Sequence, residues 1–510
     1  MTKPSTWIGF IAMSIGMFMA ILDIQIVASS LPDIQAGLRI PRHLLSWIQT
    51  SYLIAEIIAM MLSGFLTPVL STGGLFAASV SGFTLFSVGC ACSQNWETLI
   101  AFRVLQGFCG GAIIPVAFSA GYTIFPPAQQ ARATLIAGSL AVLAPTIGPC
   151  LGGYITENFD WPWLFLINLG PGLIVVPVVW FLIRVDRPDP GRLRRIDVGA
   201  LVSLSLALAA IELLLNQAPQ DHWRSGWDKA YGTVVLAAGW FGLRRCRVAA
   251  VPLIQLDLFR ERRFAAACVL NFLFGAGLYG SVYLLPLFLG FVRDHTALEI
   301  GIIMTAMGGA QLLAAPVAAI ADRHCPPMLV ATIGFVLFAC GMLANGFETP
   351  RSDAAALFWP QVLRGCGVLL IILPLTTVAL ASQPSCNLAD ASALLNVLRN
   401  IGGAIGIAGA DTVIISRSHV IGDEIVARLK SGDRDTAAFV GLPLDRFHGG
   451  QIGPISDADR EFVRPLIEHA AATIAFNEAW LILGTAMAAG LVLIPLLGRG
   501  NRMTKASDLI

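Results

Sequence analysis

Residues 7–29 read WIGFIAMSIGMFMAILDIQIVAS, and this stretch decides the class of fold. It is apolar over slightly more than the roughly 20 residues that an α-helix needs to cross a bilayer. A helix satisfies its own backbone hydrogen bonds, as any segment surrounded by lipid must. We therefore expect a membrane-spanning helix here, with one carboxyl, Asp23, inside the membrane.

The rest of the chain has the same character. Of its 510 residues, 56% are apolar and 13% are charged, and the mean hydropathy is +0.74. Soluble domains carry about 25% charged residues, so this composition excludes a soluble enzyme, and it is far too apolar for a disordered chain. The net charge of +1 gives no indication of a nucleic-acid partner. Long continuous apolar runs also argue against the alternating strands of a membrane β-barrel.

Apolar runs alternate with glycine, proline and charged residues, which favour turns. The predicted spans are 7–29, 43–66, 73–93, 98–120, 133–157, 162–183, 197–215, 229–243, 264–290, 298–320, 328–347, 355–381, 389–416 and 475–497. The span at 229–243 is short and has the weakest pattern. The sequence thus predicts an all-α polytopic membrane protein with 14 transmembrane helices.

Spans four and twelve contain a short internal repeat. Residues 103–107 read RVLQG and residues 361–365 read QVLRG, and a proline follows each glycine eight or nine residues later. If spans seven and eight are an insert, these are the fourth spans of two halves, and such repeats are frequent in transporters. We predict a six-helix bundle at 1–190, a two-helix insert with basic cytoplasmic linkers at 191–263, and a second six-helix bundle at 264–510.

The positions of lysine and arginine predict the orientation. With a cytoplasmic N-terminus, seventeen of them fall in inner segments and six in short outer loops, as the positive-inside rule requires. Both termini are then cytoplasmic, and the long segment 417–473 is a periplasmic loop. Residues 420–429 in that loop could form a short amphipathic helix.

A charge at mid-bilayer costs about 2.5–3.5 kcal/mol on insertion scales, so such a residue faces a cavity or a partner. The candidates for proton coupling are Asp23, Glu56, Arg103, Glu212, Arg399 and Asp411. Glu212 lies three residues from a span end and could equally be interfacial. Arg364 is the second-half counterpart of Arg103, and its partner is not evident.

Asp23 and Arg103 lie at similar depth in the membrane. Each is about six residues from the outer end of its span, which is roughly 9 Å at 1.5 Å per residue. The equal depth predicts an ion pair or a shared water network. The alternative is a structural pair that only locks helix packing.

A polar stripe runs along span two. Gln49, Tyr52 and Glu56 are spaced by three and four residues, so they share one helix face and should line a cavity. Burial favours the protonated form of a carboxyl, so Glu56 could hold a proton and release it when wetted or met by a cation. The alternative is a permanently protonated, hydrogen-bonded Glu56.

Span thirteen carries a second stripe, which includes Asn396, Arg399, Asn400 and Asp411. We predict that a substrate cavity is lined by Gln25, Gln49, Tyr52, Asn271, Tyr279, Gln311, Asn396 and Asn400.

Span five contains residues 144–153, which read APTIGPCLGG. Proline kinks a helix and glycine lets another helix approach closely. We therefore predict a bent, tightly packed helix between the halves. The residues of this motif are Ala144, Pro145, Gly148, Pro149, Gly152 and Gly153.

These residues resemble the fourteen-span drug:proton antiporter branch of the major facilitator superfamily, and within it the EmrB-like export permeases. The resemblance extends over essentially the whole chain, and its motifs lie at 22–32, 103–111, 144–153, 163–172 and 398–406. It implies the major facilitator fold, a role for Arg103 in proton transfer, and an antiporter motif in span five.

One stretch departs from the superfamily pattern. The loop between spans two and three has Pro68 where the superfamily has an acid, and the usual basic residues are missing. The second-half copy retains Asp322 and Arg323, which are therefore the predicted gating residues. Gating in the first half must differ.

The resemblance implies a proton-driven exporter of amphipathic or hydrophobic compounds in the bacterial inner membrane, working by alternating access without a metal or other cofactor. It also implies a periplasmic adaptor and an outer-membrane channel as partners, with segment 417–473 as a candidate contact or a merely solvated loop. A dedicated exporter of one metabolite or siderophore would share every residue above. A non-transporting sensor or an intramembrane enzyme is a remote alternative, because no histidine lies centrally in a predicted span.

Overall fold

The computed structural model describes residues 4–191, 197–217, 225–249, 255–383, 388–442 and 457–498, and the regular structure in these ranges is helical. The helices are α1 (Pro4–Ser29), α2 (Leu31–Leu38), α3 (Trp47–Leu70), α4 (Thr72–Ala91), α5 (Trp96–Gly110), α6 (Ile113–Thr123), α7 (Pro127–Phe159), α8 (Trp163–Leu166), α9 (Leu169–Leu182), α10 (Val198–Gln217), α11 (Gly226–Val248), α12 (Arg262–Phe291), α13 (Ala297–His324), α14 (Pro327–Ala344), α15 (Ala354–Ala381), α16 (Leu388–Lys430), α17 (Arg434–Val440) and α18 (Asp457–Gly490). Short 3₁₀ segments include η4 (Asn345–Phe347) and η6 (Leu491–Leu497).

Thirteen segments in the described residues are long and apolar enough to cross a membrane, and each corresponds to a predicted span. The fourth combines α5 and α6. The predicted span at 229–243 does form a helix, α11, but it is not among the thirteen. Charged residues at both of its ends, such as Lys229 and Arg244, leave it a shorter apolar stretch.

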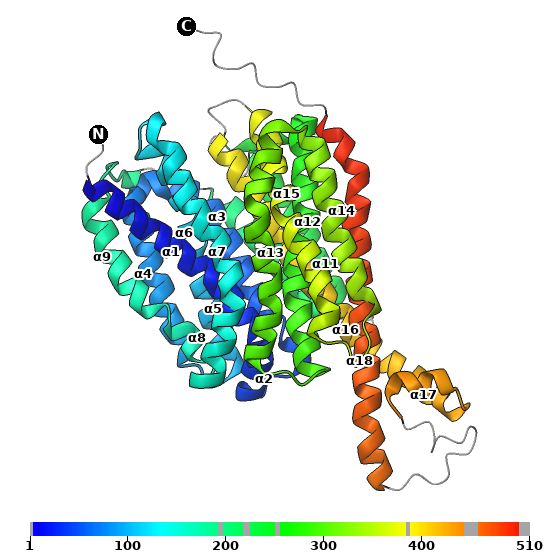
Figure 1. Ribbon diagram of the computed structural model, residues 1–510. Coiled ribbons are helices and arrows are strands. Elements are labelled where there is room, and N and C mark those ends of the chain that lie inside the picture. Colours follow the sequence, from blue (N-terminus) through cyan, green and yellow to red (C-terminus); the bar gives the residue numbers. More distant parts are fainter. Residues whose placement is uncertain are drawn as a thin grey trace.

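The helices form two bundles, α1–α9 and α12–α18, which Figure 1 shows side by side. The bundles meet along two helix pairs, α7 with α13 and α3 with α16. In each pair, the second span of one half packs on the fifth span of the other. Two such reciprocal pairs are expected when the chain contains an internally repeated six-span unit.

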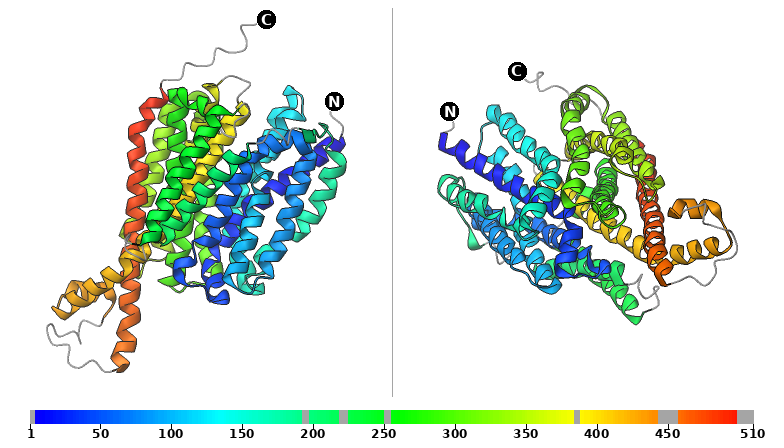
Figure 2. Two further views of the ribbon diagram at one scale, coloured as in Figure 1. Left: turned by 180° about the vertical axis from the view of Figure 1, so that it is seen from behind. Right: turned by 60° about the horizontal axis from the view of Figure 1, so that its bottom comes forward.

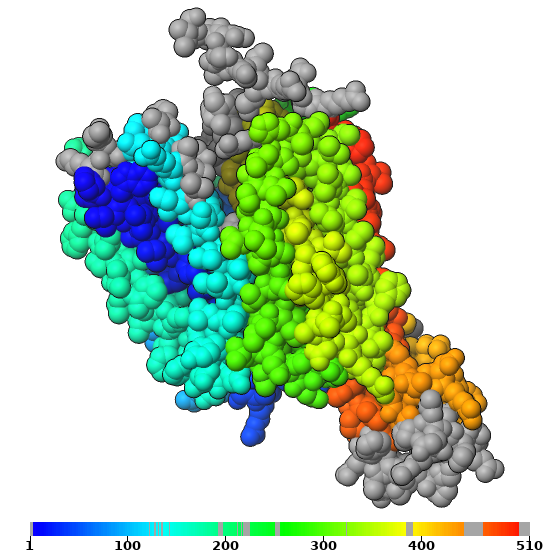
Figure 3. Space-filling model, viewed as in Figure 1, coloured from blue at the N-terminus to red at the C-terminus, as the bar shows by residue number. Residues whose placement is uncertain are grey.

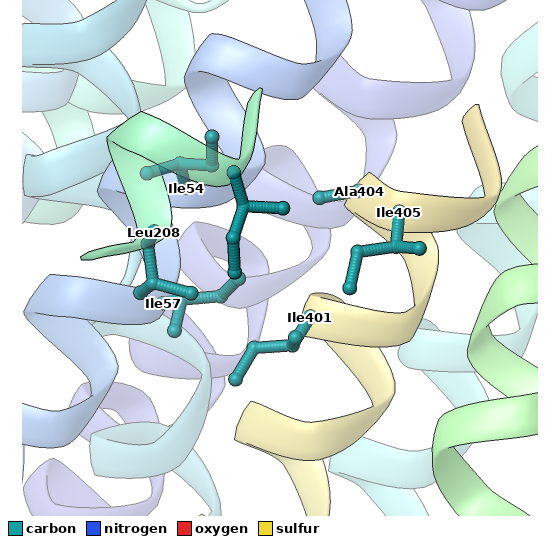
Figure 4. A pocket seen from close by; sticks show the side chains of 7 residues that line it. Ile54, Ile57, Leu208, Ile401, Ala404 and Ile405 are labelled. Carbon is teal, nitrogen blue, oxygen red and sulfur yellow. The ribbon is translucent and has the colours of Figure 1, made fainter. Parts of the chain in front are cut away.

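Helices α10 and α11 pack on each other, and α10 also contacts α3 and α16. Figure 4 shows this junction, where an apolar crevice is lined by Ile54, Ile57, Leu208, Ile211, Ile401, Ala404 and Ile405. The insert therefore lies over the edge of the interface between α3 and α16.

Beyond one end of the bundles, α16, α17 and the first turns of α18 form a helical projection (Figures 2 and 3). It has its own apolar core, made of Ile421, Ile425, Leu429, Ala437, Val440, Ala470, Ala471 and Ala475. At its base, Arg417 donates from two nitrogens to the Glu478 carboxylate at 2.7 and 2.9 Å.

Most of the segment 417–473, expected as a loop between spans, is helical in the described residues. Residues 420–429 are not a separate amphipathic helix but a continuation of α16, a single helix of 43 residues. The physical reason is that Ile421, Ile425 and Leu429 recur every four residues, and α17 and α18 cover that apolar face.

Candidate functional site

Asp23 and Arg103 form the centre of a buried network in the first bundle. Arg103 Nη1 donates to Asp23 Oδ2 at 2.6 Å, so the predicted ion pair is present. The other carboxylate oxygen, Oδ1, accepts from Asn168 Nδ2 at 2.8 Å and Gln106 Nε2 at 3.0 Å. The side chains of Asp23 and Arg103 are 0% and 1% exposed. This charge pair is therefore enclosed and well bonded, which a buried pair needs to be stable.

Arg103 is held from several helices. Its Nε donates to the Ile48 carbonyl at 3.1 Å, its Nη1 also donates to Gln106 Oε1 at 2.8 Å, and its guanidinium lies 4.2 Å from the Tyr52 ring centre. The Ser87 hydroxyl accepts from both Gln106 and Asn168. The arginine thus connects α1, α3, α4 and α5 with the segment before α9.

Ser87, Gln106 and Asn168 are members of this network that the sequence analysis missed. Gln106 lies three residues after Arg103, on the same helix face, and that spacing could have identified it. Ser87 and Asn168 share no periodic pattern with the charged residues, so only the packing of α4 on α5 and α9, and of α9 on α1, brings them together.

Two further carboxyls lie where α3 meets α16. Asn400 Nδ2 donates to Glu56 Oε2 at 3.1 Å, and the Tyr279 hydroxyl donates to Asn400 Oδ1 at 3.3 Å. About ten residues away along the same antiparallel pair, Asp411 accepts from the Tyr283 hydroxyl at 2.8 Å and from Ser46. Both carboxyls therefore bridge the two bundles, although they belong to different halves.

The polar face of α3 is buried beside these bridges. Gln49 is 3% and Tyr52 is 0% exposed. Among the described residues, neither Gln49 Nε2 nor the Tyr52 hydroxyl has a hydrogen-bond partner. The polar face of α3 is therefore buried with two unpartnered groups, and its role in lining a substrate cavity stays a prediction.

The remaining predicted cavity residues have varied surroundings. Arg399 donates to Asn396, and it lies close enough to Glu56 for electrostatic interaction. Asn271 Nδ2 donates to the Leu395 carbonyl at 2.6 Å, so it ties α12 to α16. Gln25 packs on Gly148, and Gln311 is buried in α13. The side chain of Glu212 lies outside the part of the chain that the structure describes.

The span-five motif lies in α7, between α1 and α13. A side chain at Gly152 would meet the Ile26 carbonyl of α1, and one at Gly153 would meet the Ala297 carbonyl of α13. From the opposite side, Gly301 packs on the Pro149 carbonyl. The Thr146 hydroxyl, next to Pro145 and the buried Ala144, donates to the Gly308 carbonyl at 3.0 Å. The motif thus forms a close contact between the halves.

Pro68, expected in the loop between spans two and three, lies in the last turn of α3, and the connection that follows it is bonded by an acid from another segment. Asp186, just after α9, accepts from the Thr72 backbone N–H at 2.9 and 3.0 Å and from the Thr72 hydroxyl at 3.1 Å. The Asp189 backbone N–H also donates to the Pro68 carbonyl at 3.0 Å. Asp186 therefore caps α4 from another segment of the chain.

In the second half, the Thr377 hydroxyl donates to Asp322 Oδ2 at 3.1 Å, which joins α13 to α15. The side chain of Arg323 is outside the described part of the chain.

Residues 13–407 match the Major Facilitator Superfamily. The chain belongs to this family. It is 36% identical over 405 residues to the colistin resistance protein EmrB of Acinetobacter baumannii, with 79% of each chain covered. It is 31% identical over 410 residues to the multidrug export protein EmrB of Escherichia coli K12, with 80% of each covered. The fatty acid resistance protein FarB of Neisseria gonorrhoeae is 28% identical over 409 residues, with 80% of each covered.

Solved structures show the same fold at low sequence identity. A bacterial homologue of the lysosomal transporter Spinster, in an inward-facing and occupied conformation, aligns with TM-score 0.63 at 12% identity, covering 98% of this chain and 97% of that one. A D-xylose–proton symporter aligns with TM-score 0.58 at 10% identity, covering 94% and 97%. The protein is thus an EmrB-like member of the superfamily and a multi-pass protein of the bacterial inner membrane.

Proposed function

We propose that this protein exports amphipathic compounds across the inner membrane in exchange for protons. The observation that carries the proposal is the position of Glu56 and Asp411, two buried carboxyls that each bond across the interface between the halves. A group that gains and loses a proton at such an interface couples protonation to the relative position of the halves. The family relatives named for multidrug export and resistance support the same function.

Alternating access follows from this arrangement. At one end the bundles are joined by Arg42 over the Phe291 ring, 4.7 Å from its centre, and by Pro32 against Gly290. Toward the end that bears both termini, the bundles diverge (Figure 1). With cytoplasmic termini, this conformation is closed to the periplasm. Glu56 and Asp411 accept bonds that hold this closed interface together, so a change in their protonation changes the stability of the closed conformation.

The substrates are amphipathic. The Tyr279 ring and the unpartnered polar groups of Gln49 and Tyr52 combine apolar and polar character at the interface, which suits partly apolar compounds. The names of the relatives refer to colistin, multiple drugs and fatty acids, which have different charges but share an apolar portion. This breadth favours a multidrug exporter over a carrier dedicated to one metabolite.

Inverted membrane vesicles test the proposal. In vesicles that are acid inside, adding an amphipathic drug should release internal protons, detected by a fluorescent pH probe. Glu56→Gln keeps the bond to Asn400 but cannot lose a proton, so we expect it to abolish this release while drug binding persists. Glu299→Gln changes an exposed carboxyl and serves as the control. Normal proton release by Glu56→Gln would contradict the role of Glu56.

We also propose that the projection of α16–α18 contacts a periplasmic adaptor, which would lead to an outer-membrane channel. Its separate apolar core makes it a rigid surface at the outer end of the bundles. Cysteines placed at exposed positions such as Arg464 should crosslink to the adaptor in cells. Crosslinking no stronger than at Trp227, on the insert, would identify a solvated projection without a partner.

A further inference from the structure

Arg364 of α15 is the most deeply buried cation of the second bundle that lacks a charged partner. It is 1% exposed. Its aliphatic part packs on Gly341 of α14, and its guanidinium lies 4.7 Å from the Trp480 ring centre of α18. Its Nη2 donates to Gln361. Among the described residues, its Nε and Nη1 have no hydrogen-bond partner, and no carboxyl pairs with it.

The first bundle shows what a buried arginine needs. Gly107 packs on the Tyr52 carbonyl of α3, and Gly365 packs in the same way on the Met307 carbonyl of α13, so these glycines are equivalent. Relative to them, arginine and glutamine have exchanged positions, RVLQG against QVLRG. The exchange places Arg364 at the position of Gln106, which bonds to Asp23 in the first bundle, but no carboxyl among the described residues pairs with Arg364. A buried charge without an opposite charge is strongly unfavourable.

The Trp480 ring compensates only part of this cost. A cation–π contact acts on the face of the guanidinium, whereas Nε and the two Nη groups donate in its plane. An unpartnered in-plane N–H group of a buried guanidinium is a strong donor to an anion. Because Nη2 donates to Gln361, Nε and Nη1 remain as single donors on different edges of the guanidinium, and an anion accepts from one of these edges.

Two buried neutral amides, one in α15 and one just after α14, add unpartnered donors. Gln361 Nε2 has no partner among the described residues, although its Oε1 accepts from Arg364. Asn345 of η4 is 0% exposed, and both of its side-chain polar atoms are unpartnered within the described chain. It lies one helical turn after Gly341, on the face that packs against Arg364. Unpartnered amides beside an unpaired guanidinium form an anion site rather than a cation site.

We propose that the pocket formed by Asn345, Gln361, Arg364 and Trp480 binds a small monovalent anion, either a halide or a single carboxylate group. The enclosure of Arg364 excludes a large occupant such as a lipid headgroup. The anion takes the place that Asp23 occupies beside Arg103. This site is separate from the carboxyls on the α3–α16 interface, so it does not depend on the proposed export activity.

Thermal unfolding of the purified full-length protein in detergent tests the site. Sodium gluconate is replaced by sodium chloride, bromide or formate at constant ionic strength. We expect the Tm to rise saturably, because an anion that binds only the folded state stabilises it. A rise with chloride and bromide alone assigns a halide, and a rise with formate as well assigns a carboxylate of that size. No rise with any of these anions would overturn the proposal.

Variants separate a specific site from a general salt effect. Arg364→Met should unfold at a Tm that chloride no longer changes, whereas Arg293→Met, which removes an outer arginine, should retain the wild-type response. Gln361→Leu leaves the arginine in place and should raise the chloride concentration at half-effect about tenfold, equivalent to ~1.4 kcal/mol. An unchanged chloride response in Arg364→Met would overturn the proposal.

Trp480 fluorescence provides a second measurement of anion binding, which does not depend on thermal unfolding. Bromide or iodide bound beside its ring should quench part of the tryptophan fluorescence in a saturable way, in addition to collisional quenching of exposed tryptophans. Trp480→Phe should remove only the saturable part. Saturable quenching that persists in this variant would place the anion elsewhere.

Discussion

The two bundles differ in what surrounds the buried arginine at the centre of each. In the first, Arg103 has Asp23 as a built-in counter-ion, and Gln106 and Asn168 complete the carboxylate's bonds. In the second, Arg364 has Gln361 and the Trp480 ring but no carboxylate among the described residues. A repeated helix architecture therefore does not repeat its electrostatics. The first bundle carries its own neutralising charge, and the second depends on what it binds.

The largest expected effect tests that difference directly. Asp23→Ala leaves Arg103 buried and unpaired, and breaking a buried pair costs ~3–5 kcal/mol. Arg364→Met removes a buried charge that has no protein partner, so we expect the free energy of unfolding to stay unchanged or to rise. Denaturation of both purified variants measures this contrast. Adding Arg103→Met to Asp23→Ala should recover much of the loss, and equal losses in the two bundles would contradict the comparison.

The next effect concerns the contact between the bundles. Gly153→Ala places a methyl group against the Ala297 backbone of α13, so we expect ~1–3 kcal/mol of destabilisation and strongly reduced export. Gly138→Ala, on the same helix, meets nothing within 4 Å and should behave like the wild type. Vesicle transport and Tm measure both variants. If Gly153→Ala and Gly138→Ala had the same Tm and export, the close α7–α13 contact would not be needed for either property.

A smaller effect distinguishes the two loops at the inner ends. Asp186→Ala removes the acceptor that caps α4, and losing a cap costs ~1 kcal/mol. Asp186→Asn keeps one acceptor oxygen and should recover part of that loss. The corresponding second-half change, Asp322→Ala, removes a bond to Thr377 between two helices rather than a cap. Tm measurements on the three variants should therefore rank Asp186→Ala below Asp186→Asn.

The smallest effect depends on pH and lies at the outer end of the second bundle. The pKa of Asp353 is lowered mainly by the Ala354 backbone N–H. Because the folded-state pKa of Asp353 is below its ordinary value near 4, its stabilisation is present at neutral pH. It is lost as the pH falls through that range.

Asp353→Asn should therefore lower the Tm slightly at pH 7 and have little effect near pH 3. The Asp353 side chain is 47% exposed, so we expect less than about 1 kcal/mol. A variant whose Tm difference from the wild type is the same at both pH values would contradict this assignment.

Several parts of the site were predictable. Counting residues from the span ends placed Asp23 and Arg103 at one depth, and the structure pairs them. Helical spacing placed Gln49, Tyr52 and Glu56 on one buried face. The glycines of span five predicted a tight contact, and α13 provides it. The proton-coupling roles of these residues remain predictions.

Other features depend on helices that are distant in the sequence. The outer part of α16 has too little hydropathy to be predicted as part of a span, and it stays helical because α17 and α18 cover its apolar face. Asn400 meets Glu56 across 344 residues of chain, and Asp186 replaces the missing acid near Pro68 across more than a hundred. No local pattern encodes such partners.

Hydropathy and helical periodicity are local properties, so they established the membrane class, the spans and the polar faces before any packing was considered. Whether a buried charge has a partner is a property of the assembled bundle. Residues 103–107 and 361–365 differ by an exchange of two side chains, yet one arginine meets a carboxylate and the other does not. That outcome was set by which helix faces pack around each arginine, since a neutralising charge acts only over a few ångströms in the membrane interior.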